Sequence, residues 1–260
     1  MSAAAAALAF APDAPDAIVC RLSAAVPHDL FERLAFVRAA CPGRLVVMTS
    51  FGLEDQAISH AVLSQGLDID IVTLDTGRLF AETHAVWAAT ESRYGRRIRA
   101  IVPERLELED LIERQGSDGF RLSVEARQAC CHVRKVAPLA RALEGAQAWI
   151  TGLRADQSVH RAAVSFAALD RARGMLKINP LFDWTRDQVV DFTLAHGVPV
   201  NALHERGFLS IGCAPCTRAV APGEPERAGR WWWENESKTE CGLHTQQHAD
   251  ARAAQLGSHT

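Results

Sequence analysis

The chain has 260 residues, which at roughly 100–200 residues per domain corresponds to one large domain or to one domain with an appendage. Its 28 Lys and Arg residues against 31 Asp and Glu give a net charge of −3, which excludes the strongly basic surface of a general nucleic-acid binder. Hydrophobic residues make up 48% and charged residues 23%, which excludes wholesale disorder, and no apolar run approaches the roughly 18 residues of a membrane span. We therefore expect a globular protein without a nucleic-acid or membrane partner.

The N-terminus begins with an alanine-rich run, residues 3–11. A secretory signal starts with positive charge, whereas here the first basic residue, Arg21, follows Asp13 and Asp16. We interpret residues 1–27 as an N-terminal tail and expect a cytoplasmic protein.

Hydrophobic periodicity predicts helices and strands that alternate along the chain. Helices are expected over residues 28–40, 56–65, 81–94, 106–114, 131–143 and 185–196. Strands are expected over residues 44–48, 70–74, 97–102, 148–151 and 175–178. This alternation is typical of βαβ units, so it predicts an α/β domain over residues 28–216 with a mostly parallel sheet flanked by helices. Periodicity is lost from residue 217, which sets off a C-terminal segment, 217–260.

Polar, glycine-containing turns follow three of the predicted strands, at residues 50–55, 75–78 and 152–158. Ligands of open parallel sheets bind at the carboxyl ends of the strands, so we expect these turns to meet at one edge. In the first turn, Gly52 lets the backbone approach a ligand closely, and the start of the following helix suits a phosphate or sulfate. An ordinary strand-to-helix turn explains the same residues.

Four of the seven cysteines form two pairs, Cys130-Cys131 and Cys213-x-x-Cys216. Zinc sites usually take two pairs with CxxC-like spacing, and adjacent cysteines chelate one small ion poorly because their side chains diverge. A cubane iron–sulfur cluster offers a separate iron to each sulfur, so the pattern favours a cluster over zinc. Buried thiols without a metal are the third interpretation. Lys135, one turn beyond the adjacent pair, would offset the negative charge of a cluster held by four thiolates.

Cys241 lies apart from these pairs, in a polar stretch near the C-terminus. Lys238 and His244 share its face if the segment is helical and would favour the thiolate, whereas the adjacent Glu240 would oppose it. Because few core-type residues flank Cys241, the pattern favours an exposed nucleophile over an incidental surface thiol.

Four arginines stand out by their neighbourhood. Arg154 and Arg161 follow a predicted strand, and Arg227 and Arg230 precede three consecutive tryptophans, residues 231–233. A single arginine is most often a solvated surface charge, so only this placement makes the four candidates for binding an anion.

Three cysteine-containing motifs together resemble the iron–sulfur type of assimilatory adenylyl-sulfate (APS) reductases, in the PAPS/APS reductase family. They are Cys130-Cys131-x-x-Arg134-Lys135, Gly212-Cys213-x-x-Cys216-Thr217 and Lys238-x-Glu-Cys-Gly-Leu-His244. The similarity continues through Ser50-Phe-Gly-x-Glu-Asp55, Leu74-Asp-Thr-Gly-Arg78 and Gly152-x-Arg-x-Asp-Gln-Ser158, and spans about residues 45–245.

The resemblance implies an adenine-nucleotide α-hydrolase fold, related to ATP pyrophosphatases, with a mobile C-terminal segment. It implies a [4Fe-4S] cluster held by Cys130, Cys131, Cys213 and Cys216 that is not thought to pass electrons to the substrate. It also implies that Cys241 attacks the sulfur of APS, releases AMP and becomes an S-sulfocysteine. Thioredoxin then reduces this adduct and sulfite leaves, as part of sulfate assimilation and cysteine biosynthesis. Assembly into a homo-oligomer is left open.

By the same resemblance, the turn at residues 50–55 would cradle the phosphosulfate, and the turns at 74–78 and 152–154 would line the nucleotide. The substrate-binding residues expected are Ser50, Gly52, Asp55, Leu74, Thr76, Lys135, Gly152, Arg154, Arg161, Arg227, Arg230 and His244. The basic members of this set would reduce the repulsion between a thiolate and an anionic sulfonate.

Three alternatives stay open. The substrate could be the 3′-phosphorylated nucleotide PAPS, or both nucleotides, although typical PAPS reductases lack the cysteine pairs found here. A non-reductase ATP-pyrophosphatase relative with a structural metal is the second alternative, but such proteins carry an SGGxDS loop, which residues 49–55 do not match. The third is a redox-sensing cluster protein without catalysis, in which Cys241 would be dispensable.

Overall fold

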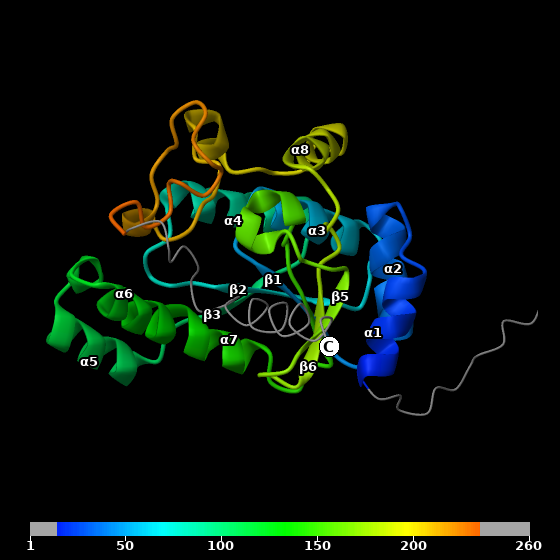
Figure 1. The fold of residues 1–260 in the computed structure, drawn as a ribbon, viewed down its shortest axis with the longest axis horizontal. Helices are drawn as coiled ribbons and strands as arrows, with labels where there is room; N and C mark the ends of the chain where they lie inside the picture. The colour runs from blue at the N-terminus through cyan, green and yellow to red at the C-terminus, as the bar shows by residue number, and fades with distance from the viewer. Residues whose placement is uncertain (1–14, 235–260) are drawn as a thin grey trace, which may run out of the picture.

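The computed structural model describes residues 15–234, and its centre is a six-stranded sheet (Figure 1). The strands are β1 Leu45–Thr49, β2 Asp70–Leu74, β3 Arg99–Ile101, β4 Ala148–Ile150, β5 Ala167–Asp170 and β6 Met175–Ile178. Their order is β3-β2-β1-β4-β6-β5, and all neighbours are parallel except β5 and β6. The predicted α/β class with a mostly parallel sheet is confirmed.

The helices flank this sheet on both faces (Figure 1). They are α1 Pro15–Ala24, α2 Leu30–Ala40, α3 Leu53–Ser64, α4 Ala81–Tyr94, α5 Arg105–Gln115, α6 Val124–Cys131, α7 Ala137–Ala142 and α8 Arg186–Ala195. Short 3₁₀ turns lie at Gly119–Arg121, Ala155–Gln157, Val159–Arg161, Ala202–Arg206 and Ala214–Cys216. None of the helices in residues 15–234 combines the length and the apolar character needed to cross a membrane.

Alternation along the central strands divides the core into two layers. Leu45 and Val47 of β1 pack into the larger layer, which also takes apolar residues of α1, α2, α3, α4 and α8. Val46, between them, points to the other face and packs with Leu139 of α7 and Trp149 of β4. Successive side chains of a strand point to opposite faces, so an uninterrupted apolar run is what a strand covered on both sides requires.

Three elements differ from the sequence-based expectation. The segment taken as a tail, residues 1–27, contains α1, whose Ile18 and Leu22 are buried in the core. The single helix expected over 131–143 is α6, a π-helical turn His132–Val136 and α7. The strand β5 was not expected, and it joins β6 through a short turn that ends at Gly174, a glycine with φ of 65°.

The chain from residue 217 to 234 contains no helix or strand, in agreement with its loss of periodicity. Backbone pairing of Thr217 with Arg230 folds this stretch back on its own start, and the Trp231 N–H donates to the Cys216 carbonyl of the preceding chain at 3.3 Å. This attachment carries Arg227 and Arg230 to the edge of the sheet.

Candidate active site

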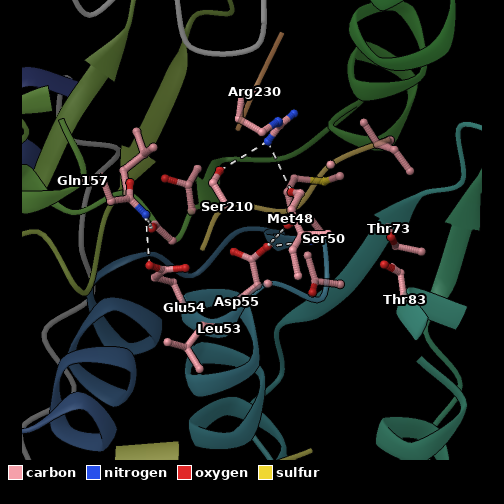
Figure 2. A pocket seen from close by; sticks show the side chains of 18 of the residues that line it. Met48, Ser50, Leu53, Glu54, Asp55, Thr73, Thr83, Gln157, Ser210 and Arg230 are labelled. Atoms are coloured by element: carbon pink, nitrogen blue, oxygen red, sulfur yellow. Dashed lines mark hydrogen bonds between the residues drawn. The ribbon is translucent and has the colours of Figure 1, made fainter. Parts of the chain in front are cut away.

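A cavity of about 210 Å³ opens at the carboxyl ends of the parallel strands. Strand β1 lies between β2 and β4, so the connections leave it in opposite directions, and ligands bind at such switch points in open α/β sheets. All three polar turns predicted to meet at one edge contribute to the lining of this cavity. Figure 2 shows side chains from the first and third of these turns, with Ser210 and Arg230, around it.

Most of the predicted substrate-binding residues are brought together here. Those that line the cavity are Ser50, Gly52, Asp55, Leu74, Thr76, Lys135, Gly152, Arg161, Arg227 and Arg230. Arg154 is not part of the lining, because its fully buried side chain lies behind the wall and pairs with Glu54, Asp156 and Glu226. His244 and Cys241 lie outside the described residues.

The turn after β1 is folded by a side chain of the following helix. Asp55 accepts hydrogen bonds from the Ser50 backbone nitrogen at 2.6 Å and from its hydroxyl at 2.7 Å (Figure 2). Between them, Phe51 takes a φ of 58°, and its buried ring stacks on Trp87 at 5.5 Å between ring centroids. Such a φ is unusual for a residue other than glycine, so aromatic packing holds the turn in an otherwise rarely populated shape.

Burial raises the pKa of Asp55 from 3.8 to about 6, although the two hydrogen bonds from Ser50 oppose the change. The adjacent Glu54 adds to the increase through charge repulsion. The helix α3 begins directly after Gly52, which has no side chain to cap it. Its N-terminus therefore brings backbone N–H groups and the positive helix end to the cavity, which suits an anion.

Basic side chains also line the cavity. Lys135, Arg161, Arg227 and Arg230 line it, against the carboxylates of Glu54, Asp55 and Glu226. Arg227 and Arg230 both donate to the Ser210 hydroxyl, at 3.5 and 3.4 Å, and Arg230 also donates to the Ile211 carbonyl at 3.3 Å (Figure 2). Two guanidinium groups fixed on one hydroxyl present an anion with donors whose directions are already set.

The four paired cysteines surround a second, smaller cavity of about 20 Å³. Cys130 and Cys131 end α6, and Cys213 and Cys216 bracket the 3₁₀ turn Ala214–Cys216. They form one buried cluster with Phe120, Trp231 and Trp233. Among the described residues no three His, Cys, Asp or Glu side chains converge tightly enough for a single metal ion.

The thiols of this cluster have different acidities. Burial opposes ionisation of Cys213, but Lys135, the Thr76 hydroxyl at 3.3 Å from its Sγ, and nearby arginines outweigh this and lower its pKa. Burial and the neighbouring Cys213 raise the pKa of Cys216 to about 12.

The two cavities are neighbours, since Lys135 and Cys213 line both. Lys135 sits in the π-helical turn directly after the adjacent cysteines, and this turn was not visible in the sequence. A π-helical turn widens the local spacing of side chains, which lets one helix serve two cavities.

Several lining residues were missed by sequence reasoning. Gln157 donates to Glu54 at 3.1 Å and accepts from Arg161, so it links an acidic and a basic residue of the lining. His204 keeps its Nδ1 2.8 Å from the Phe208 carbonyl, and burial lowers its pKa. Gln157 lies within the motif of residues 152–158, whereas no motif contains His204.

Comparison with known proteins agrees with this geometry. Residues 44–219 match the family model described as phosphoadenosine phosphosulfate reductase domain. The adenosine 5′-phosphosulfate reductase of Sinorhizobium fredii (strain NBRC 101917 / NGR234) is 56% identical over 223 residues, covering 86% of this chain and 88% of that protein. The reductase of the same name from Agrobacterium fabrum is 55% identical over 216 residues, covering 83% of each.

Among solved structures, a phosphoadenylyl-sulfate (PAPS) reductase from Candida auris in complex with phosphate superposes with a TM-score of 0.66. It is 25% identical, and the match covers 78% of this chain and 96% of that one. The family match over residues 44–219, which include the whole sheet and all four paired cysteines, together with relatives above 50% identity, identifies the chain as a member of the phosphoadenosine phosphosulfate reductase domain family.

Proposed function

We propose that this protein reduces adenylyl sulfate to sulfite and AMP, with thioredoxin as the reductant and an S-sulfocysteine on Cys241 as the intermediate. The observation that carries the proposal is the cavity at the strand switch point, whose lining includes four basic side chains and an uncapped helix N-terminus. That cavity suits a nucleotide bearing a doubly anionic phosphosulfate. The names of the relatives above 50% identity favour adenylyl sulfate as the substrate.

The reaction is a series of displacements at sulfur. The Cys241 thiolate attacks the sulfonate sulfur of the substrate, the bond from sulfur to the phosphate oxygen breaks, and AMP leaves with the electron pair. One thioredoxin thiol then attacks the Cys241 sulfur, and sulfite leaves with the electron pair of the sulfur–sulfur bond. The second thioredoxin thiol attacks the resulting mixed disulfide and releases the Cys241 thiolate. The dithiol ends as a disulfide and supplies both electrons. A covalent intermediate divides one difficult reduction into two easier steps.

The basic residues of the cavity act on the first displacement. A thiolate approaching a sulfonate meets like charge, and Lys135, Arg161, Arg227 and Arg230 offset this charge along the phosphosulfate. Charge also develops on the departing phosphate oxygen, which the helix N-terminus at Leu53 favours. The residues described here therefore bind and orient the substrate, while the nucleophile comes from the C-terminal segment.

We further propose that Cys130, Cys131, Cys213 and Cys216 hold a [4Fe-4S] cluster. Four soft thiol donors around one small cavity fit a cluster with separate iron corners better than a single ion, for which no tight three-residue group exists within residues 15–234. Lys135 and Arg134 border the cavity and would offset the charge of the thiolates. When bound, the cluster would tie α6 to the Cys213 turn as a structural unit and carry no electrons to the substrate.

Intact-protein mass spectrometry tests the function. Anaerobically purified protein is mixed with APS or with PAPS in the absence of thioredoxin. We expect one sulfonate adduct from APS, its absence in Cys241→Ser, and its discharge by thioredoxin. An adduct from PAPS as well would make the enzyme dual-specific. No adduct from either nucleotide, with iron content intact, would contradict the reductase proposal and favour a non-reductase member of the wider fold family.

A further inference from the structure

The buried Arg154 joins three parts of the molecule that are distant in sequence. Its Nε lies 2.9 Å from Glu54 on α3, one terminal nitrogen 2.9 Å from Asp156 beside it, and the other 2.9 Å from Glu226 in the C-terminal segment. The Arg154 side chain has no exposed surface, and those of Glu54 and Glu226 are 13% and 15% exposed. These charges are therefore poorly screened by water.

Both Glu54 and Glu226 also line the large cavity, so their pairing decides what the cavity presents to a ligand. Each carboxylate contacts the same guanidinium, which holds the two like charges close together. Without this guanidinium, the two carboxylates would repel one another and an anionic substrate. Arg186 also forms an ion pair with Glu226, at 3.8 Å, which is longer than the 2.9 Å contact from Arg154.

Glu226 directly precedes Arg227, and three residues later comes Arg230. The two arginines meet on Ser210. Backbone pairing of Thr217 with Arg230 holds the base of residues 217–234, but Glu226 and Arg227 lie in the loop between these two residues and in no helix or strand. The Arg154–Glu226 pair is therefore a side-chain anchor between this stretch and the wall formed by Glu54. Gln157 extends the anchor to Arg161, since it bonds to both Glu54 and Arg161.

We infer that Arg154 is a positioning residue that anchors Glu226 to Glu54 and thereby sets Arg227 and Arg230 in the cavity, without touching the substrate itself. This inference rests on the proposed function. It replaces the expectation that Arg154 lines the nucleotide. The arginines already bind the anionic phosphosulfate in the ground state, and the charge that they offset during the attack is the same charge. Loss of the anchor should therefore weaken substrate binding more than it slows the displacement.

Steady-state kinetics with APS and thioredoxin test this role. Arg154→Met keeps the volume of the side chain and removes its charge. We expect it to raise KM for APS at least about tenfold while kcat stays within about threefold, as for loss of uniform binding. Arg154→Lys keeps the charge but cannot reach three carboxylates, so its KM should lie between those of the wild type and of Arg154→Met.

A double-mutant cycle shows whether Arg154 acts through Glu226. Glu226→Ala alone should raise KM, and the double variant Arg154→Met/Glu226→Ala should be no worse than Arg154→Met, because the anchor is already lost. Glu226→Ala also keeps the test available if Arg154→Met fails to fold. If the rise in KM of the double variant were the product of the rises in the two single variants, Arg154 and Glu226 would act independently, which would overturn the inference.

A matched control comes from Arg33, which is 2% exposed and lies 2.6 Å from Asp183 in an ion pair. Neither residue lines the cavity. Arg33→Met should lower the thermal midpoint of unfolding yet leave KM within about twofold of wild type. An equal rise in KM in Arg33→Met, or a folded Arg154→Met with wild-type KM, would sink the positioning role. Absence of turnover in the wild-type chain would instead refute the proposed function.

Discussion

Asp55 accepts two hydrogen bonds from Ser50, one from its backbone nitrogen and one from its hydroxyl, and so closes the turn at the mouth of the cavity. The same burial that makes this contact specific raises the pKa of Asp55 to about 6. The carboxylate is thus held in its charged form at neutral pH at a cost to stability.

The first prediction follows from that cost. The pKa of Asp55 is higher in the folded state than its usual 3.8, so its contribution to stability is fully present below pH 3.8 and is lost as the pH rises through 6. Asp55→Asn removes this titration. We expect its stability relative to wild type to increase by about 2 kcal/mol between pH 4 and pH 7. Urea unfolding across this range measures it, and a constant difference would contradict the raised pKa.

His60 should produce the opposite pH dependence. It is buried against the ring of His196 at 4.9 Å, with its Nδ1 2.8 Å from the Tyr94 hydroxyl. Burial, with repulsion from His196 and Arg93, lowers its pKa from 6.5 to about 4. The stability that depends on neutral His60 is therefore present above pH 6.5 and is lost as the pH falls through 4.

Replacing His60 by Phe should reduce the fall in the free energy of unfolding between pH 7 and pH 4. The wild type should lose about 2–3 kcal/mol more than His60→Phe between pH 7 and pH 4 in urea unfolding. His28, whose side chain is exposed, provides the control for a change from histidine to phenylalanine outside the buried cluster. An identical slope in His60→Phe and wild type would show that His60 is not the group that titrates.

Gly152 should tolerate no side chain at the cavity wall. An added Cβ would lie 2.7 Å from both the Asp55 Oδ1 and the Glu54 Cβ, closer than side-chain carbons approach. Gly152→Ala must therefore displace the start of α3, and we expect at least about tenfold weaker AMP binding by calorimetry.

The matched variant is Gly43→Ala, whose Cβ would meet Gln147 Oε1 at the same 2.7 Å, away from the cavity. It should cost stability, about 1–3 kcal/mol as for overpacking, and leave AMP affinity unchanged. If both variants weaken AMP binding equally, the effect is general destabilisation, and the prediction that a side chain at residue 152 disturbs the cavity wall itself is wrong.

Cys213 should matter more for metal content than a cysteine of the core. Cys213→Ser removes one of the four thiols around the small cavity and should lower the iron bound per chain severalfold after anaerobic purification. Cys41→Ser, at a fully buried position in the larger layer of the core, should retain the iron content of the wild type. Equal iron in all three proteins would contradict the proposed cluster site.

The sequence was sufficient for the sheet, because strands covered on both faces carry unbroken apolar runs such as residues 45–48. It was not sufficient for β5, whose four residues show no alternation and depend on pairing with β6. It also missed α1, where only Ile18 and Leu22 are buried and the remaining residues resemble a polar or small-residue tail.

The site was predictable where motifs sit on strand ends, as with Ser50 and Gly152. Sequence could not reveal that Arg154 turns away from the cavity, because its carboxylate partners come from segments 100 and 72 residues away. Nor could it indicate His204, whose place in the lining follows only from how the chain returns after α8. The roles of Cys241 and His244 stay predictions, since both lie outside the described residues.

The reach of the Arg154 contacts also bears on how the chain folds. Glu54 and Arg154 follow β1 and β4, whose pairing of Leu45 with Ala148 closes a similar interval of the chain. The Arg154 contacts therefore become local only once these strands have paired. They should form late, after the sheet has assembled. Changes at Arg154 or Glu226 should therefore speed unfolding while leaving the refolding rate nearly unaltered. The wall of the cavity would then be the first part of the native architecture to open when the molecule begins to unfold.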